Sequence, residues 1–166
     1  MKKTFILMLL AMLAVCITSC KKSGDTKDVE NTVLLKCHFN GNGENFSISY
    51  PEILQVGYTD ETTFTANAAD NDARLDVVLK QDGDFSDLMQ FMETFKNQAE
   101  FEKFDEPTID GNVITMKSVN LGEVCRYFVV KKDDQNAVVG KYYYKEAKAA
   151  DFEKFFEPIL KSVEIQ

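Results

Sequence analysis

The sequence of 166 residues contains no tryptophan, one histidine and three prolines. One histidine and few cysteines cannot supply the usual Cys/His ligand sets of zinc sites. The sequence also lacks the Cys-x-x-Cys pair of thioredoxin-type redox proteins and the glycine-rich loops that bind phosphate groups. The sequence therefore predicts no metal and no cofactor.

The amino terminus has the zones of a bacterial export signal. Lys2 and Lys3 supply positive charge, and residues 5–17 are almost wholly apolar. That run is too short to span a bilayer comfortably, and it has the length of a signal-peptide core. It is followed at once by a small residue, Ser19, and then by Cys20. This arrangement predicts an exported protein that is processed at the cysteine.

The sequence ITSC at residues 17–20 resembles the lipobox of bacterial lipoproteins. In that family the cysteine receives a diacylglycerol, and a peptidase cuts just before it. The resemblance implies a signal peptide at residues 1–19 and a lipid on Cys20, which begins a polar tether over residues 20–32. Two or three acyl chains anchor a protein stably. Lys21 stands where Asp would imply retention in the inner membrane, so we expect the periplasmic face of the outer membrane, with surface exposure left open.

The chain is strongly acidic. Its formal net charge is −8, and removal of residues 1–19, which contain Lys2 and Lys3 and no acidic residue, changes that value to −10. Such a domain repels nucleic-acid phosphates and anionic lipid headgroups. We therefore expect no nucleic-acid partner, and we expect contact with the membrane through the lipid on Cys20.

Four cysteines are present. Cys16 would leave with the signal peptide and Cys20 would carry the lipid, which leaves Cys37 and Cys125. A disulfide between these two is permitted in an oxidising compartment, and it would contribute about 4 kcal/mol at best. The alternative is a pair of buried thiols that act as small apolar side chains. Both alternatives remain open at the level of sequence.

Alternating and β-branched residues predict two β-hairpins in the first half of the chain. Residues 33–39 and 46–50 flank the turn sequence NGNG, which accepts positive φ at low cost. Residues 62–68 and 73–80 flank a polar turn of the sequence DND. Since each pair is joined by a short connection, we expect antiparallel pairing within each hairpin.

The second half of the chain predicts a helix, a three-stranded meander and a further helix. The strand candidates are residues 113–119, 124–131 and 137–145, and the last helix covers residues 147–163. Pro158 must kink that helix or begin a second one. Both helices have apolar residues at helical spacing. The stripes that we expect to be buried are Phe85, Leu88 and Met92 in the first helix and Phe152, Phe155 and Leu160 in the second.

This order of elements predicts one α+β domain over residues 33–166, with a single mainly antiparallel sheet flanked by two amphipathic helices. The segments FSISYP at residues 46–51 and ILKSVEI at residues 159–165, together with a mid-chain helix after paired strands, resemble the Mog1/PsbP-like group. The resemblance implies a non-enzymatic accessory or binding protein, since that group consists largely of such proteins and includes bacterial lipoproteins.

The single histidine limits nucleophilic catalysis. Cys37 precedes His38 on a predicted strand, so the two side chains point to opposite faces and cannot act together. A pair of Cys125 with His38 remains geometrically open. The simpler interpretation of His38 is a surface residue.

Two acidic clusters and a run of tyrosines complete the candidates. The DND turn at residues 70–72 with Asp76, and the DGD sequence at residues 82–84, lack the full ligand spacing of a calcium loop, so we expect polar turns. In residues 142–144, YYY, the first and third tyrosines share one face of a strand and the second takes the other face. We expect core or edge packing there, with a partner surface as the alternative.

Taken together, these features predict a lipid-anchored, non-catalytic accessory or binding domain of the bacterial envelope. Its expected contacts are the membrane, through the lipid on Cys20, and a protein partner. The alternative is an envelope hydrolase or other enzyme with an unrecognised active site. A deep polar pocket near His38 would favour that alternative.

Overall fold

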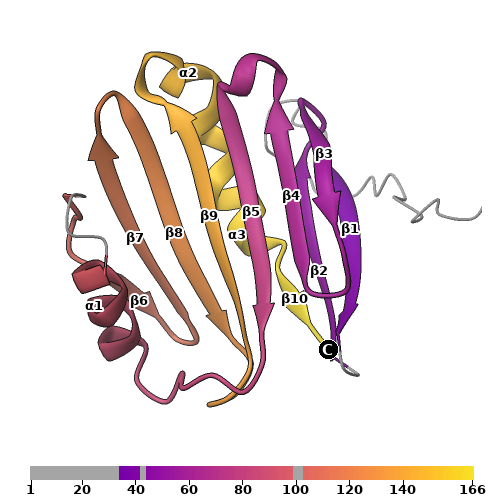
Figure 1. The fold of residues 1–166 in the computed structure, drawn as a ribbon, viewed down its shortest axis with the longest axis vertical. Coiled ribbons are helices and arrows are strands. Elements are labelled where there is room, and N and C mark those ends of the chain that lie inside the picture. Colours follow the sequence, from indigo (N-terminus) through magenta and orange to yellow (C-terminus); the bar gives the residue numbers. More distant parts are fainter. Residues whose placement is uncertain (1–33, 42–43, 99–102) are drawn as a thin grey trace, which may run out of the picture.

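The computed structural model describes residues 34–41, 44–98 and 103–166 (Figure 1). Strands dominate these residues, and each hairpin expected from the sequence is formed. The strands are β1 (Leu34–Gly41), β2 (Glu44–Pro51), β3 (Leu54–Thr59), β4 (Thr63–Ala68), β5 (Ala73–Lys80), β6 (Thr108–Asp110), β7 (Val113–Asn120), β8 (Glu123–Lys131), β9 (Ala137–Lys145) and β10 (Glu164–Ile165).

The strands form two sheets, whereas the sequence predicted one. The small sheet has the order β1-β2-β10 and the large sheet the order β3-β4-β5-β9-β8-β7-β6, with antiparallel pairing throughout. Figure 1 shows the small sheet behind β3 and β4. The expectation of a single sheet is wrong because β2 ends at Pro51, and the chain enters the second sheet after two residues.

The core between the sheets is rich in aromatic rings. Phe39 stacks on Phe46 at 4.5 Å between ring centroids, and both rings are buried. At Gly140 in β9, a Cβ atom would lie 2.0 Å from Cζ of Phe128, so the ring occupies the space above the glycine. The Phe128 ring thus packs over a glycine of the neighbouring strand. Both residues lie on the face of the large sheet that is turned toward the core, which we call the back face.

Helix α1 (Leu88–Gln98) lies on the opposite, front face of the large sheet. The carboxylate of Asp87 accepts a hydrogen bond from the backbone N–H of Gln90 at 3.0 Å, which caps the first turn. Phe85, Leu88 and Met92 are buried, at 1, 6 and 2 % exposure, as their spacing predicted. The first stripe is therefore confirmed.

The last helix expected from the sequence is broken into short pieces, which cover the back face beside the small sheet (Figure 1). Phe152 and Phe155 are buried, whereas Leu160 is half-buried. Pro158 falls in the first turn of the last piece, where its missing N–H needs no partner. In the described part of the chain, no helix has the length and apolar character needed to cross a membrane. The pieces are η2 (Glu146–Lys148), α2 (Ala149–Phe152), η3 (Glu153–Phe155) and α3 (Phe156–Lys161).

Candidate interaction surface

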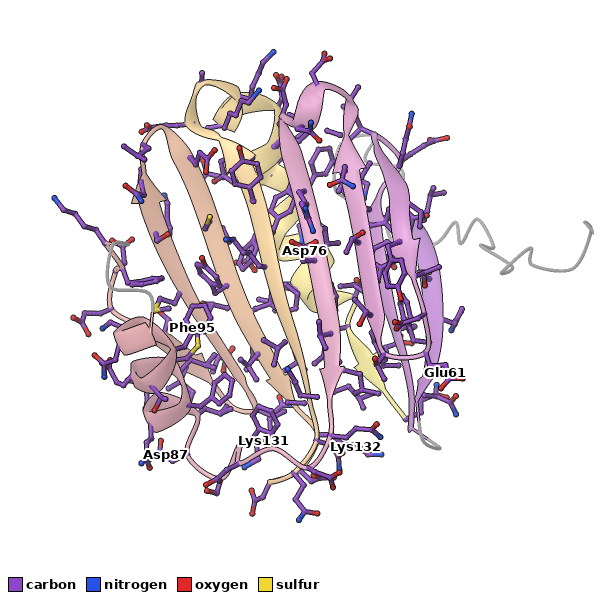
Figure 2. All side chains as sticks on the ribbon, in the orientation of Figure 1. Glu61, Asp76, Asp87, Phe95, Lys131 and Lys132 are labelled. Atoms are coloured by element: carbon purple, nitrogen blue, oxygen red, sulfur yellow. The ribbon has the colours of Figure 1, made fainter. Side chains whose placement is uncertain are left out.

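A broad part of the front face is not covered by any helix of the described chain. The cluster under α1 includes residues of β7, β8 and β9, and within the described ranges it includes none from β3, β4 or β5. Figure 2 shows Asp76 near the middle of this uncovered area, well away from α1. We call this surface the open face. It comprises Gln55, Tyr58, Thr63, Thr65, Asn67, Arg74, Asp76, Val78, Lys141 and, where it borders the cluster under α1, Tyr143.

Strict alternation in the sequence produces the open face. In β4 (TFTANA), Phe64 and Ala66 are fully buried, while the threonines and the asparagine between them are half-buried. In β5, Leu75 and Val77 are buried and Arg74 is exposed. Because side chains alternate between the two faces of a strand, one face of β4 and β5 is apolar and the other is polar.

The centre of the open face carries charges of both signs. Nε of Arg74 lies 2.7 Å from Oδ1 of Asp76, and their side chains are 52 and 34 % exposed. Lys141 lies directly opposite Asp76 in the register, and its Nζ lies 5.2 Å from the centroid of the Tyr127 ring. An exposed ion pair of this kind contributes little to stability. These groups therefore contribute little to the stability of the fold.

Tyrosines stand at both ends of the open face. Tyr143 donates a hydrogen bond to Oε1 of Glu123 at 2.9 Å, and burial followed by this carboxylate raises the pKa of Tyr143 to about 12. At the other end, Tyr58 is 54 % exposed and donates to Oδ2 of Asp60 at 2.7 Å. That hydrogen bond and the backbone N–H of Thr62 hold the pKa of Asp60 below its usual value. Both ends thus combine an aromatic ring with a carboxylate.

His38 lies far from the open face, on the outer surface of the small sheet, where it is exposed. Ser47 and Glu164 occupy the same row of that sheet. Glu164 accepts hydrogen bonds from Lys36 at 2.7 Å and from the Ser47 hydroxyl at 3.2 Å, and these contacts lower its pKa. In a catalytic triad the histidine stands between the nucleophile and the acid. Here the Ser47 hydroxyl donates directly to the Glu164 carboxylate, and the histidine does not stand between them. The spacing of these residues in the sequence gave no reason to expect this contact.

Cys37 and Cys125 are both buried as thiols. Cys37 belongs to the core between the two sheets, whereas Cys125 belongs to the cluster under α1, on the other side of the large sheet. Their side chains therefore do not converge as a disulfide requires. This placement corresponds to the alternative of two buried thiols that act as small apolar side chains. It also separates Cys125 from His38, which lies beyond the small sheet.

The acidic clusters form ion pairs and turns. Asp72 lies 2.7 Å from Nζ of Lys145 and 3.7 Å from Nζ of Lys148, and Lys145 lowers the pKa of Asp72. Asp84 accepts hydrogen bonds from the backbone N–H and the hydroxyl of Ser86. Within residues 34–41, 44–98 and 103–166, no group of three or more candidate ligands is placed to hold a metal ion.

The tyrosine run divides as its position on a strand predicted. Tyr142 and Tyr144 are buried in the core behind the large sheet, and the Tyr142 hydroxyl donates to the backbone oxygen of Phe152 at 3.0 Å. Burial raises the pKa of Tyr142 well above its usual value, and burial followed by Glu153 raises that of Tyr144 to about 12. Tyr143 alone of the three contributes to the open face.

The hollows that can be traced on the described surface are shallow and open. One, of about 350 Å³, lies at the end of the sheets beside α2 and is lined in part by Ile53, Phe152 and Phe155 together with charged side chains. Another, of about 390 Å³, lies between α1 and β6. His38 lines neither of them.

Comparisons with known proteins define the class of fold. No protein-family model matches the sequence, and no curated protein matches it either. Among solved structures, the chain is similar to the solution structure of cyanobacterial PsbP (CyanoP) from Synechocystis, with a TM-score of 0.51 and 14 % sequence identity. The match covers 92 % of this chain and 96 % of that chain. The described chain therefore has a PsbP-like α+β fold.

Proposed function

We propose that this protein is a lipid-anchored, non-catalytic accessory domain of the bacterial envelope that binds a protein partner through the open face. The PsbP-like fold supports an accessory role only as an analogy, since unrelated functions occur on one fold. The open face itself carries the proposal.

The shape and chemistry of the open face suit a protein better than a small molecule. Small ligands bind in concave, mostly apolar pockets. The open face instead follows one sheet surface across β3, β4, β5 and β9, and none of its side chains is fully buried. Tyrosine and arginine are enriched at protein interfaces, and this surface presents Tyr58, Tyr143 and Arg74. A flat, partly aromatic surface with both charge signs favours protein contact.

The proposed anchor is the lipid on Cys20, which lies outside the described residues. The support is the apolar run of residues 5–17, which ends in the lipobox-like sequence. Cys20→Ala should abolish labelling by radioactive palmitate in cells, since the acceptor thiol is removed. Cys16→Ala, four residues earlier in the expected signal peptide, is the matched control and should be labelled normally. Labelling and membrane retention of the Cys20→Ala protein would contradict the anchor.

Binding through the open face is testable by site-specific crosslinking. A photo-crosslinking amino acid at Arg74, at the centre of the open face, should capture one defined envelope protein in cells. The same amino acid at Lys161, whose side chain is 77 % exposed on α3, is the matched control. Capture of the same protein from both positions, or from Lys161 alone, would contradict the open face as the binding surface.

Among the described residues, the hydroxyl of Ser47 donates to the carboxylate of Glu164, and His38 does not stand between them as the histidine of a Ser-His-Asp triad does. This arrangement gives no support to the alternative of an envelope hydrolase.

A further inference from the structure

Strand β3 forms one edge of the large sheet and is unusually accessible. It pairs with β4 on one side and with no other strand of the described chain. After Leu54, each of its residues is exposed. Val56 and Tyr58 are 44 and 54 % exposed, and Ile53, just before the strand, is 54 % exposed. An edge strand with unpaired backbone groups is a template for pairing with another segment.

The other edges in the described chain have features that discourage such pairing, and β3 lacks most of them. β6 has three residues, follows Pro107 and ends in an aspartate, while β10 has two residues. β1 carries Lys36 and His38. Charged side chains, proline and short length are the usual protections of an edge. β3, with the sequence LQVGYT, has no charged residue and no proline.

β3 carries one irregularity, a register shift between Val56 and Tyr58 in its pairing with β4. A Cβ atom on Gly57 would lie 2.6 Å from Nδ2 of Asn67 and 3.3 Å from Oγ1 of Thr65, so the backbone approaches β4 closely here. A bulge twists the strand and interrupts the ladder at one point. A bulge is one of the features that discourage edge pairing, so β3 keeps this single protection, and an incoming strand would have to match the bulge in register.

Carboxylates flank β3 at both ends. Glu52 precedes it, and Asp60 and Glu61 follow it, all exposed. Figure 2 shows Glu61 near the turn that leaves the strand. Antiparallel pairing of β3 with a second copy would place Glu52 of one chain near Asp60 and Glu61 of the other, which like-charge repulsion disfavours. A segment with basic residues at its ends would instead meet opposite charge at both ends.

We propose that β3 binds an extended segment of the partner protein by strand addition, and that this segment has an uncharged, β-branched middle and basic flanks. This inference rests on the proposed function, because it names the kind of segment that the accessory domain recognises. In strand addition, main-chain hydrogen bonds supply affinity and alternate side chains supply specificity. The partner's side chains would contact Val56 on one side of the edge and Tyr58 on the other.

The test uses the mature chain and a fluorescent peptide of sequence KKTVTVTKK. Saturable binding by fluorescence anisotropy is expected. A peptide with identical side chains but N-methyl groups on alternate residues should bind at least about tenfold more weakly, because it cannot complete the ladder. A version with glutamates in place of the lysines should also bind at least about tenfold more weakly at low salt, and the difference should shrink at high salt.

Two matched variants locate the site. Tyr58→Lys adds a charge to the edge and should weaken binding of KKTVTVTKK at least about tenfold. Leu121→Lys alters a side chain that is 95 % exposed in the β7–β8 turn, and it should leave binding unchanged. Amide chemical shifts of Leu54–Thr59 should move on binding, a direct readout that does not depend on either variant.

Three results would overturn the inference. They are equal binding by the N-methylated peptide, chemical-shift changes confined to strands other than β3 and β4, and a concentration-dependent dimer that Tyr58→Lys abolishes. The last result would identify a second copy as the occupant. If crosslinking from Arg74 captures a partner while the peptide fails to bind β3, the proposed function stands and the inference about β3 is wrong. If the peptide binds β3 but the crosslinker at Arg74 captures nothing, the proposed binding through the open face is wrong, whereas strand addition at β3 stands.

Discussion

The two faces of the large sheet come from the same alternating strands but have different neighbours. The back face packs against the small sheet and the broken carboxy-terminal helices, and its core includes Phe39, Phe46, Phe64, Phe128 and Phe156. The front face is covered by α1 at one end and carries the open face over the rest. Burial of aromatic rings dominates core energetics, whereas exposed polar groups contribute little.

Under the proposed function, this difference separates stability from recognition within one sheet. Substitutions on the back face should lower the free energy of unfolding strongly, those under α1 moderately, and those on the open face hardly at all. Residues of the open face can therefore be replaced without loss of the fold.

The largest effect is expected for Gly140→Val on the back face. Its Cβ would occupy the position of the Phe128 ring, which lies 2.0 Å from an ideal Cβ. We expect a loss of about 3 kcal/mol in the free energy of unfolding, at the upper end of the usual cost of overpacking, measured by urea denaturation. Adding Phe128→Leu to this variant should restore part of the loss. A neutral Gly140→Val would show that the back face is loosely packed.

Met92→Ala tests the packing under α1. Met92 is 2 % exposed, and its removal should cost about 2–3 kcal/mol, toward the lower end of the usual range because α1 is packed on one side only. Met89, in the same helix and 38 % exposed, is the matched control, and Met89→Ala should change stability by less than about 0.5 kcal/mol. Equal effects of the two would show that α1 does not pack as described.

An alkaline titration compares the two faces through Tyr143 and Tyr144. Both have pKa values raised to about 12 in the folded chain, against roughly 10 for an unfolded tyrosine. The stability that each neutral phenol contributes is complete below about pH 10 and is lost as the pH rises toward about 12. Between these pH values, the free energy of unfolding should fall less steeply with pH in Tyr143→Phe and in Tyr144→Phe than in the unsubstituted protein.

The causes of the two shifts can then be separated. Glu123→Gln removes the carboxylate that faces Tyr143 and should lower the pKa of that residue, while Tyr144, which is raised by burial and Glu153, should titrate as before. Phenolate absorbance, assigned with the two phenylalanine variants, measures both values. A Tyr144 pKa that falls with Tyr143 would mean that the faces are electrostatically coupled through the sheet.

A smaller effect is expected at the first turn of α1. Asp87→Ala removes the acceptor for the N–H of Gln90 and should cost about 1 kcal/mol. Asp87→Asn should cost much less, since asparagine caps helices about as well as aspartate. Thermal denaturation of the three proteins checks this order. An equal loss in both variants would indicate that charge, rather than the cap, is responsible.

The smallest effect is expected on the open face. Arg74→Ala breaks the pair with Asp76 and should change the free energy of unfolding by less than about 0.5 kcal/mol. The same variant should nevertheless weaken partner binding. A loss of stability comparable to that of Met92→Ala would contradict the separation of roles between the two faces.

Local patterns in the sequence were sufficient to predict most strands and the packing of α1. The hairpin of β1 with β2 follows from the NGNG turn, and Phe85, Leu88 and Met92 are buried as their spacing requires. The PsbP-like fold was likewise suggested by resemblance and is supported by the structural match. These features depend on neighbours in the sequence, where the alternation of apolar and polar residues is informative.

Features that depend on distant contacts were missed. The sequence of β3, LQVGYT, alternates apolar and other residues, but five of its six residues are exposed, because the strand lies at an edge of the sheet. The second sheet forms because the chain changes layers after β2 ends at Pro51. No local pattern in the sequence indicates this change of layer. The open face was anticipated only through Tyr143, because its other members are ordinary polar strand residues until the register brings them together.

The pairing of β10 with β2 has a consequence for the order in which the chain can fold. Residues Glu164 and Ile165 pair with Ser47 and Phe46, so the third strand of the small sheet is made more than a hundred residues after the second. Domains begin to fold as they emerge during synthesis. Here the small sheet cannot be completed until residue 165 has been added. The described strands of the large sheet all precede β10 in the chain, so that sheet can form before the small sheet is closed.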